Sequence, residues 1–189
     1  MTSLPVSSRR SGPLLAILLL SAACTLISFP SRAEGPATPF TKPVIDIGMV
    51  VSDIDKSVRF YTNVIGFREV PGFDVPAAMG KKIGLTDSKP VKIRVFELGE
   101  GNLATKLKLM SFPDLAVAKP ERKFVHSTMG LNYLTIYVSD ITQAMRQLKE
   151  GGVKLLGESP VELGGGTKLV TCQDPDGTFL ELIGPAKAP

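Results

Sequence analysis

The four residues Val51-Ser52-Asp53-Ile54 return in the second half of the chain as Val138-Ser139-Asp140-Ile141. Each copy ends a stretch with a strand-like apolar pattern and begins a stretch with apolar residues at helical spacing. Internal similarity of this kind indicates two equivalent units that pack together. We therefore predict two copies of one folding unit, which share one site.

The first unit is predicted to start with a strand over residues 44–51, followed by a helix that ends at Gly66. Ser52 and Asp55 have the spacing of a capping box at the start of this helix. Strand-like stretches follow at residues 67–70, 91–98 and 105–110.

The second unit repeats this order, with Asp140 as helix cap together with Gln143, and with Gly151-Gly152 as the helix stop. Its later strands are predicted at residues 154–156, 168–172 and 178–183. The sequence Asp174-Pro175-Asp176-Gly177 is a strong turn signal between the last two strands. The unit is thus βαβββ, an α+β arrangement that occurs twice.

Two groups of residues resemble the vicinal oxygen chelate (VOC) superfamily, which includes glyoxalase I, extradiol dioxygenases, fosfomycin-resistance enzymes and bleomycin-resistance proteins. The first group is Val51-Ser52-Asp53 with Ser57-Val58-Arg59-Phe60-Tyr61 and Ile65-Gly66-Phe67, and the second is Asp174-Pro175-Asp176-Gly177-Thr178-Phe179-Leu180-Glu181-Leu182. The resemblance implies a domain over residues 44–186, with module one at about 44–112 and module two at about 130–184. It also implies an eight-stranded, cup-shaped half-barrel with helices on the outside and a small-molecule cavity inside.

Residues 1–33 have the pattern of an export signal, followed by a linker over residues 34–43. Arg9 and Arg10 precede an apolar run over residues 14–29, which is shorter than the ~20 residues of a membrane-spanning helix. Ser31-Arg32-Ala33 fits a cleavage site, so we expect a periplasmic or secreted protein. Lipid attachment at Cys24 and an uncleaved signal anchor are the alternatives.

Cleavage after residue 33 would remove three arginines from the 22 basic residues and none of the 18 acidic residues. The remaining charges nearly balance, which argues against nucleic acid as a partner. We expect no membrane association after cleavage. Cys172 would be the single cysteine left, so no internal disulfide is possible.

The resemblance assigns the metal-ligand positions of the superfamily to Asp46, Lys108, Tyr133 and Glu181. Relatives that use a metal have His, Glu or Gln there, and only Glu181 matches outright. A protonated Lys108 repels a cation. We therefore predict no cofactor, and an ion-pair network in which Lys108 faces two carboxylates. If a divalent metal does bind, its ligands would be Asp46, Tyr133 and Glu181.

The favoured hypothesis is a protein that binds, and can also transform, a small organic ligand in the cup without a metal. Lys108 would hold an anionic group and Tyr133 would donate a hydrogen bond. Asp46, Glu181 and Tyr133 are the candidate catalytic residues, with a carboxylate as general base. The cavity walls would come from Thr135, Tyr137 and Phe179.

Two other functions stay open. One is a metal-dependent lyase or isomerase of the glyoxalase type, and the other is a non-catalytic interaction module with a filled cup. An iron site with two histidines is impossible because His126 is the only histidine. One chain carries both modules, so either a monomer or a homodimer can complete a cup.

Overall fold

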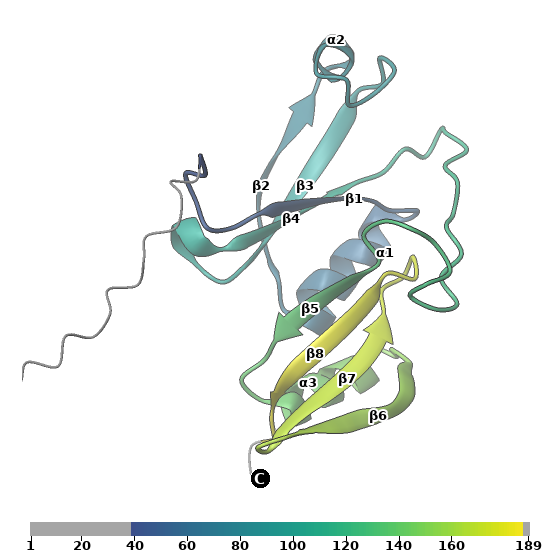
Figure 1. Ribbon diagram of the computed structural model, residues 1–189. Helices are drawn as coiled ribbons and strands as arrows, with labels where there is room; N and C mark the ends of the chain where they lie inside the picture. The colour runs from purple at the N-terminus through teal and green to yellow at the C-terminus, as the bar shows by residue number, and fades with distance from the viewer. Residues whose placement is uncertain (1–38, 187–189) are drawn as a thin grey trace, which may run out of the picture. The chain divides into compact units, whose positions relative to one another are not determined.

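The computed structural model describes residues 39–186, and its helices and strands lie in the unit that begins at Phe40. In each half of this unit a strand and a helix are followed by three further strands, and the first half has an additional short helix, α2, between the second and third of its strands (Figure 1). The first half contains β1 (Asp46–Val50), α1 (Ile54–Arg59), β2 (Arg68–Val75), β3 (Val91–Leu98) and β4 (Thr105–Met110). The second half contains β5 (Tyr133–Tyr137), α3 (Ile141–Glu150), β6 (Leu155–Gly164), β7 (Thr167–Gln173) and β8 (Phe179–Pro185).

The strands form two four-stranded sheets of matching topology, β1-β4-β3-β2 and β5-β8-β7-β6. In each sheet the first and last strands of the module are parallel neighbours, and the remaining pairs are antiparallel. Within residues 39–186 no strand pairing closes the sheets into a barrel, as expected for a cup. The predicted α+β class with two βαβββ modules is confirmed. The predicted export signal and Cys24 lie outside the described residues.

The N-cap of the first helix lies one residue later than predicted. The Oδ1 atom of Asp53 accepts a hydrogen bond from the backbone N–H of Lys56 at 2.9 Å, so Asp53 is the N-cap and the predicted capping box of Ser52 and Asp55 is wrong. Asp53 has the extended backbone that an N-cap requires. The helix continues as the π-helical segment η1 (Phe60–Ile65) and stops at Gly66, whose φ of 98° favours glycine.

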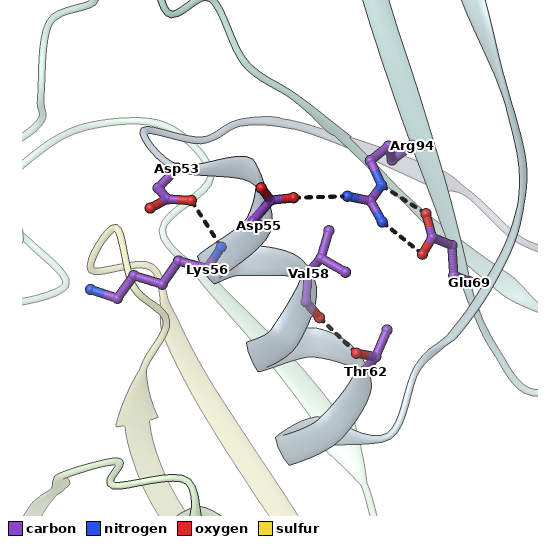
Figure 2. A network of polar contacts seen from close by, with 7 residues as sticks. All are labelled: Asp53, Asp55, Lys56, Val58, Thr62, Glu69 and Arg94. Atoms are coloured by element: carbon purple, nitrogen blue, oxygen red, sulfur yellow. Dashed lines mark hydrogen bonds and ion pairs between the residues drawn. The ribbon is translucent and has the colours of Figure 1, made fainter.

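A guanidinium connects this helix to the first sheet (Figure 2). Arg94 on β3 donates from Nε and Nη2 to the two carboxylate oxygens of Glu69 on β2, at 2.7 and 2.8 Å. Its Nη1 lies 3.4 Å from Asp55 on α1. Arg94 lowers the pKa of Glu69, chiefly through the hydrogen bonds. The same side of the sheet therefore carries both the helix and this ion pair.

Helix α3 begins at the predicted cap. The Oδ1 atom of Asp140 accepts hydrogen bonds from the N–H groups of Thr142 and Gln143, at 2.9 and 3.3 Å. The cap of the second repeat is thus confirmed. Two such bonds satisfy donors that the first helical turn leaves without backbone partners.

One hydrophobic core serves both modules. Phe96, Leu107 and Leu109 of the first sheet belong to the same buried cluster as Leu148 of α3 and Leu180 of β8. α3 contacts η1 as well as β7 and β8 of its own sheet. Because the core is shared, the two repeats depend on each other for burial of their helix-facing sides.

The segment at residues 76–90 interrupts only the first module. β2 extends five residues beyond its predicted end to Val75, and α2 (Ala77–Lys82) connects it to β3 at the far end of this hairpin (Figure 1). A short turn of 3-10 helix, η2 (Gly101–Leu103), joins β3 to β4. β6 is likewise longer than predicted and runs to Gly164.

Candidate functional site

The candidate site residues lie on the strand faces that point away from the shared core. We call these the outer faces. Alternation along β4 places Leu107 and Leu109 in the core and Lys108 on the outer face of the first sheet. Alternation along β5 places Ile136 in the core and Tyr133, Thr135 and Tyr137 on the outer face of the second sheet. Lys108, Tyr133, Thr135 and Tyr137 therefore lie on the side of their strands opposite to the core residues.

On the first sheet, Asp46 and Lys108 form an ion pair. Lys108 Nζ lies 2.8 Å from Asp46 Oδ2, across the parallel strands β1 and β4. The hydrogen bond from Lys108 holds the pKa of Asp46 below its usual range. The ammonium group also lies 6.0 Å from the ring centroid of Phe73 on β2. Lys108 thus stands between a carboxylate and an aromatic ring, both partly accessible.

A second group of charges extends the outer face of this sheet. Glu97 on β3 pairs with Arg68 at 2.7 Å and with Lys106 at 3.2 Å. Beside these charges lies a small apolar cluster whose buried members are Val75, Val91, Ile93 and Val95. The face therefore combines an apolar floor with five charged side chains.

On the second sheet, Glu181 is held by a hydroxyl. Thr135 Oγ1 donates to Glu181 Oε2 at 2.8 Å, between the parallel strands β5 and β8. Tyr133 and Tyr137 are 51% and 79% exposed, whereas Phe179, opposite Tyr133 in the strand register, is only 9% exposed. This face offers hydroxyl groups and aromatic surface, with one carboxylate.

Comparison with known proteins places this architecture in a family. Residues 44–182 match the model of the Glyoxalase/Bleomycin resistance protein/Dioxygenase superfamily. The chain belongs to this superfamily. It is also similar to a 2-epi-5-epi-valiolone epimerase of an Actinomyces species, with 30% identity over 165 residues, 82% of this chain and 86% of the epimerase.

A solved structure supports the same fold for this superfamily member. The glyoxalase family protein from Bacillus cereus superposes with a TM-score of 0.63, covering 83% of this chain and all of that protein at 20% identity. At this identity the likeness concerns the fold alone. Among residues 39–186 no helix is both long and apolar enough to span a membrane.

The donor set does not fit the metal site that the superfamily implies. The ammonium group of Lys108 is bound to Asp46 at one of the four positions, where it repels a cation and occupies the carboxylate. In the described part of the chain, no three His, Cys, Asp or Glu side chains lie close enough to hold an ion. These four positions therefore do not form a metal-ligand set.

The structure brings the predicted residues together in pairs. Asp46 lies with Lys108, and Glu181 lies with Thr135. Among the ion pairs of residues 39–186, Lys108 pairs with Asp46, and Glu181 is not its partner. The predicted network with two carboxylates around Lys108 is therefore wrong, because its two carboxylates stand on different sheets. Two cavities, of about 630 and 340 Å³, are lined by other residues.

A polar group in the core was not predicted. The hydroxyl of Tyr61 on η1 donates to Asp174 Oδ2 at 2.9 Å, and Asp174 Oδ1 accepts from the N–H groups of Asp176 and Thr178. The Ser52 N–H donates to Asp176 at 3.0 Å. These bonds connect the start of the first helix to the last turn of the second module.

Burial changes the ionisation of this group. Desolvation raises the pKa of Asp174, although three hydrogen bonds oppose the rise. Desolvation and the nearby Asp174 also raise the pKa of Tyr61, so its hydroxyl keeps its proton. A signal was present in the sequence: Tyr61 occupies the repeat position that Leu148 has in the second helix, which puts a hydroxyl in an apolar stripe.

The remaining reactive side chains lie apart from the outer faces. His126 stacks on Phe124 in an exposed loop, with ring centroids 5.5 Å apart. Cys172 is fully buried in the core, and burial raises the pKa of its thiol to about 11. A thiol with this pKa is a poor nucleophile at neutral pH, so Cys172 serves as a small apolar residue of the core.

Proposed function

We propose that this protein binds a small organic ligand on the outer faces of its sheets, without a resident metal. The observation that carries the proposal is the repeated placement of a polar pair. Asp46–Lys108 and Thr135–Glu181 both join the first and last strands of a module on the side away from the core. Tyr133 and Tyr137 are exposed on the same strand as Thr135, and exposed aromatic side chains next to a polar pair are typical of a binding surface.

The chemistry of the two pairs indicates what such a ligand offers. Lys108 can donate a charge-assisted hydrogen bond to an anionic group of the ligand, which weakens its ion pair with Asp46. Tyr133 and Tyr137 supply hydroxyl donors and aromatic surface, and the polar rim around Lys108 stands next to the apolar floor of the first sheet. A ligand with a carboxylate or several hydroxyl groups and an apolar ring fits these groups.

A ligand screen by melting temperature tests the proposal, because a ligand of the native state must stabilise it. The panel would contain organic carboxylates, cyclic polyols and cyclic hydroxyketones. We expect at least one class to raise Tm, and Lys108→Gln or Glu181→Gln to abolish the rise. Lys82→Gln, an exposed lysine on α2, is the control. If no class raises Tm, an interaction module without a ligand becomes the better description.

A second candidate function is epimerisation, favoured by the likeness to the 2-epi-5-epi-valiolone epimerase. Inverting a carbon next to a carbonyl group needs a base that removes the proton and an acid that returns one to the opposite face. We propose Glu181 as the base, since Thr135 holds its carboxylate, and Tyr133 as the acid. The carbon loses a proton to Glu181 and receives one from Tyr133, so no oxidant or reductant is required, and proton exchange with water returns both side chains to their starting states.

Proton exchange measures this activity directly. Incubation with 2-epi-5-epi-valiolone in deuterated water should give deuterium at the inverted carbon, detected by NMR. Glu181→Gln should abolish the incorporation, whereas Lys82→Gln should leave it unchanged. Incorporation that persists in Glu181→Gln would remove Glu181 from this role while keeping the epimerase hypothesis.

The metal-dependent lyase or isomerase is tested by metal content. The purified protein would be incubated with zinc, nickel, manganese and iron(II) and examined by plasma mass spectrometry. Binding of less than stoichiometric metal, unchanged in Glu181→Ala, agrees with our proposal. A full equivalent that is lost in Glu181→Ala would contradict it.

We also propose that the protein is exported, with cleavage after residue 33. The support is the sequence of residues 1–33, in which two arginines precede an apolar run and a small-residue cleavage site. N-terminal sequencing of the protein from the periplasm or the medium should begin at Glu34. An intact N-terminus in the cytoplasmic fraction would contradict export.

The oligomeric state is a separate question. Sedimentation of the purified protein would distinguish the monomer from the homodimer.

A further inference from the structure

A cavity of about 630 Å³ lies between the two modules, on the side of the helices rather than on the outer faces. We call it the inter-module cavity. One wall comes from α1 and η1, and the other from the end of α3, the start of β6 and the turn after β7. Its volume is within the range of about 300–1,000 Å³ that small-molecule sites have.

Three cationic side chains line this cavity. Lys56 and Arg59 are one turn apart on α1, and Lys154 stands on the opposite wall. All three are exposed, and none takes part in the ion pairs found among residues 39–186. By contrast, Lys108 on the outer face already has a carboxylate partner. An anion can therefore bind to these cations without breaking an existing ion pair.

The neutral polar side chains of the lining include both donors and acceptors. Gln173 donates from Nε2 to the carbonyl oxygens of Arg122 and Gly177, which leaves its Oε1 as an acceptor. The Thr62 hydroxyl lies 2.9 Å from the carbonyl oxygen of Val58 and 3.0 Å from Asn63 Oδ1, and its single proton goes to one of them. The preference of this cavity for an anion therefore rests on its cationic side chains.

Asp174 is the only acidic residue among those that line the cavity, and it is buried. It is 6% exposed, and both of its oxygens accept hydrogen bonds from Tyr61 and from backbone N–H groups. Its carboxylate is already engaged by these bonds, and it forms no ion pair with Lys56, Arg59 or Lys154. Among the residues that line the cavity, the cationic side chains therefore have no carboxylate partner.

Apolar side chains complete the cavity. Phe60 and Val64 on one wall face Val153 and Leu156 on the other. Gly151 allows the walls to meet closely at one end, because a Cβ there would lie 2.6 Å from a methyl group of Val64. A ligand would contact an apolar slot with three cationic side chains along its rim.

We propose that the inter-module cavity binds an organic anion with an apolar body, either a carboxylate or a phosphate monoester. The site is separate from the outer faces, so it does not depend on the function proposed above. An anion between Lys56 or Arg59 on one side and Lys154 on the other would form charge-assisted hydrogen bonds to both modules. It would also act as a bridge between the two repeats.

Calorimetric titration with phenyl phosphate, benzoate and benzyl alcohol tests this site. The first two share an aromatic body with an anionic group, and the third has the body without the charge. We expect saturable binding of at least one anion and weaker binding of the alcohol. The stronger of the two anions identifies the phosphate or the carboxylate class. If the alcohol binds as well as the anions, or neither anion binds, the proposal is wrong.

Variants locate the binding. Arg59→Gln with Lys154→Gln should lower the affinity for the anion at least about tenfold, because two charge-assisted bonds are lost. The control variant, Lys81→Gln with Lys82→Gln, removes the same amount of charge from α2 and should leave the affinity for the anion unchanged. Loss of binding in Lys108→Gln alone would instead assign the anion to the outer face and overturn the inter-module site. Circular dichroism of each variant confirms that it is folded.

NMR gives a second readout that does not depend on affinity. Anion binding should shift the side-chain amide signals of Asn63 and the backbone amides of residues 151–154. The amides around Asp46 and Lys108 should not move. The opposite pattern of shifts would contradict a site between the modules.

Discussion

Single residues do different work on the two sides of the sheets. Lys108 and Asp46 sit on an accessible face, where an ion pair contributes only about 0–1 kcal/mol to stability. Tyr61 and Asp174 are buried, where a missing hydrogen bond is costly. We therefore expect substitutions of the first pair to affect binding, and substitutions of the second pair to affect folding.

Tyr61→Phe tests the buried pair. The substitution keeps the ring but deprives Asp174 of one of its three hydrogen bonds, so we expect the free energy of unfolding to fall by about 1–3 kcal/mol. Urea unfolding followed by circular dichroism measures the change. Tyr137→Phe removes the same hydroxyl from an exposed ring and should change stability by less than about 0.5 kcal/mol. Equal effects would show that the buried hydrogen bond is unimportant.

The pH dependence of stability should have opposite signs for two aspartates. Folding raises the pKa of Asp174 above 3.8, so the native state holds this proton more tightly, and stability falls as pH rises through the interval above 3.8. Folding lowers the pKa of Asp46, so its contribution is present above 3.8 and is lost as pH falls below that value.

Two Asn variants isolate these contributions in urea unfolding over a series of pH values. Relative to the unmodified protein, Asp174→Asn should become more stable as pH rises, because it lacks the ionisation that burial disfavours. Asp46→Asn should become less stable relative to the unmodified protein as pH rises through the interval below 3.8. Parallel curves for both variants and the unmodified protein would contradict the direction of both pKa shifts.

The side of the sheet on which each candidate lies was predictable from the sequence, but its partner was not. Alternation along a strand sets the side of Lys108 and Glu181 without reference to the rest of the fold. The partner depends on which strands become neighbours and on how far two sheets lie apart, and no local pattern contains that distance. For the same reason the hydrogen bond from Tyr61 to Asp174 could not be predicted, because it joins residues of different modules.

Among the elements, the helices show how far local rules extend. The order of strands and helices, the stop at Gly66 and the cap at Asp140 followed from capping and turn chemistry. The cap of the first helix did not follow from these rules. The backbone N–H of Ser52 donates to the distant carboxylate of Asp176, and Asp53 occupies the N-cap position instead. The longer β2 and β6 also depend on pairing with their neighbours rather than on their own residues.

The cap assignment has a direct test. Asp53→Ala removes the acceptor for the Lys56 N–H and should lower the free energy of unfolding by about 0.5–2 kcal/mol. Ser52→Ala keeps the backbone N–H that Ser52 uses and should cost much less. Thermal unfolding of both variants shows which residue caps the helix. A larger loss of stability in Ser52→Ala than in Asp53→Ala would favour the capping box of Ser52 and Asp55 instead.

Two glycines in strands differ in the space around them. A Cβ at Gly184 on β8 would lie 2.2 Å from the backbone oxygen of Val138, whereas a Cβ at Gly48 on β1 would meet only a methyl group of Met110 at 3.6 Å. Gly184→Ala should therefore destabilise the protein by about 1–3 kcal/mol, as overpacking does. Gly48→Ala should be tolerated in the same chemical denaturation assay, and similar effects would contradict the close approach at Gly184.

At the scale of the whole domain, the repeats form one thermodynamic unit. They share a core, and the bonds from Ser52 and Tyr61 to the last turn cross between them. We expect one cooperative transition. Native-state hydrogen exchange should give the same maximal opening free energy for the amides of Leu107 in the first sheet and Val170 in the second. Two separate maxima would show that each module folds alone.

The placement of the tyrosines provides an optical probe of the outer face. The chain has no tryptophan and three tyrosines, so tyrosine alone supplies its intrinsic fluorescence. Tyr61 is fully buried with its hydroxyl bound to a carboxylate, whereas Tyr133 and Tyr137 are exposed beside Glu181 on the second sheet. A ligand that binds to this face therefore changes the fluorescence of two of the three tyrosines, Tyr133 and Tyr137. Binding can then be followed without any label.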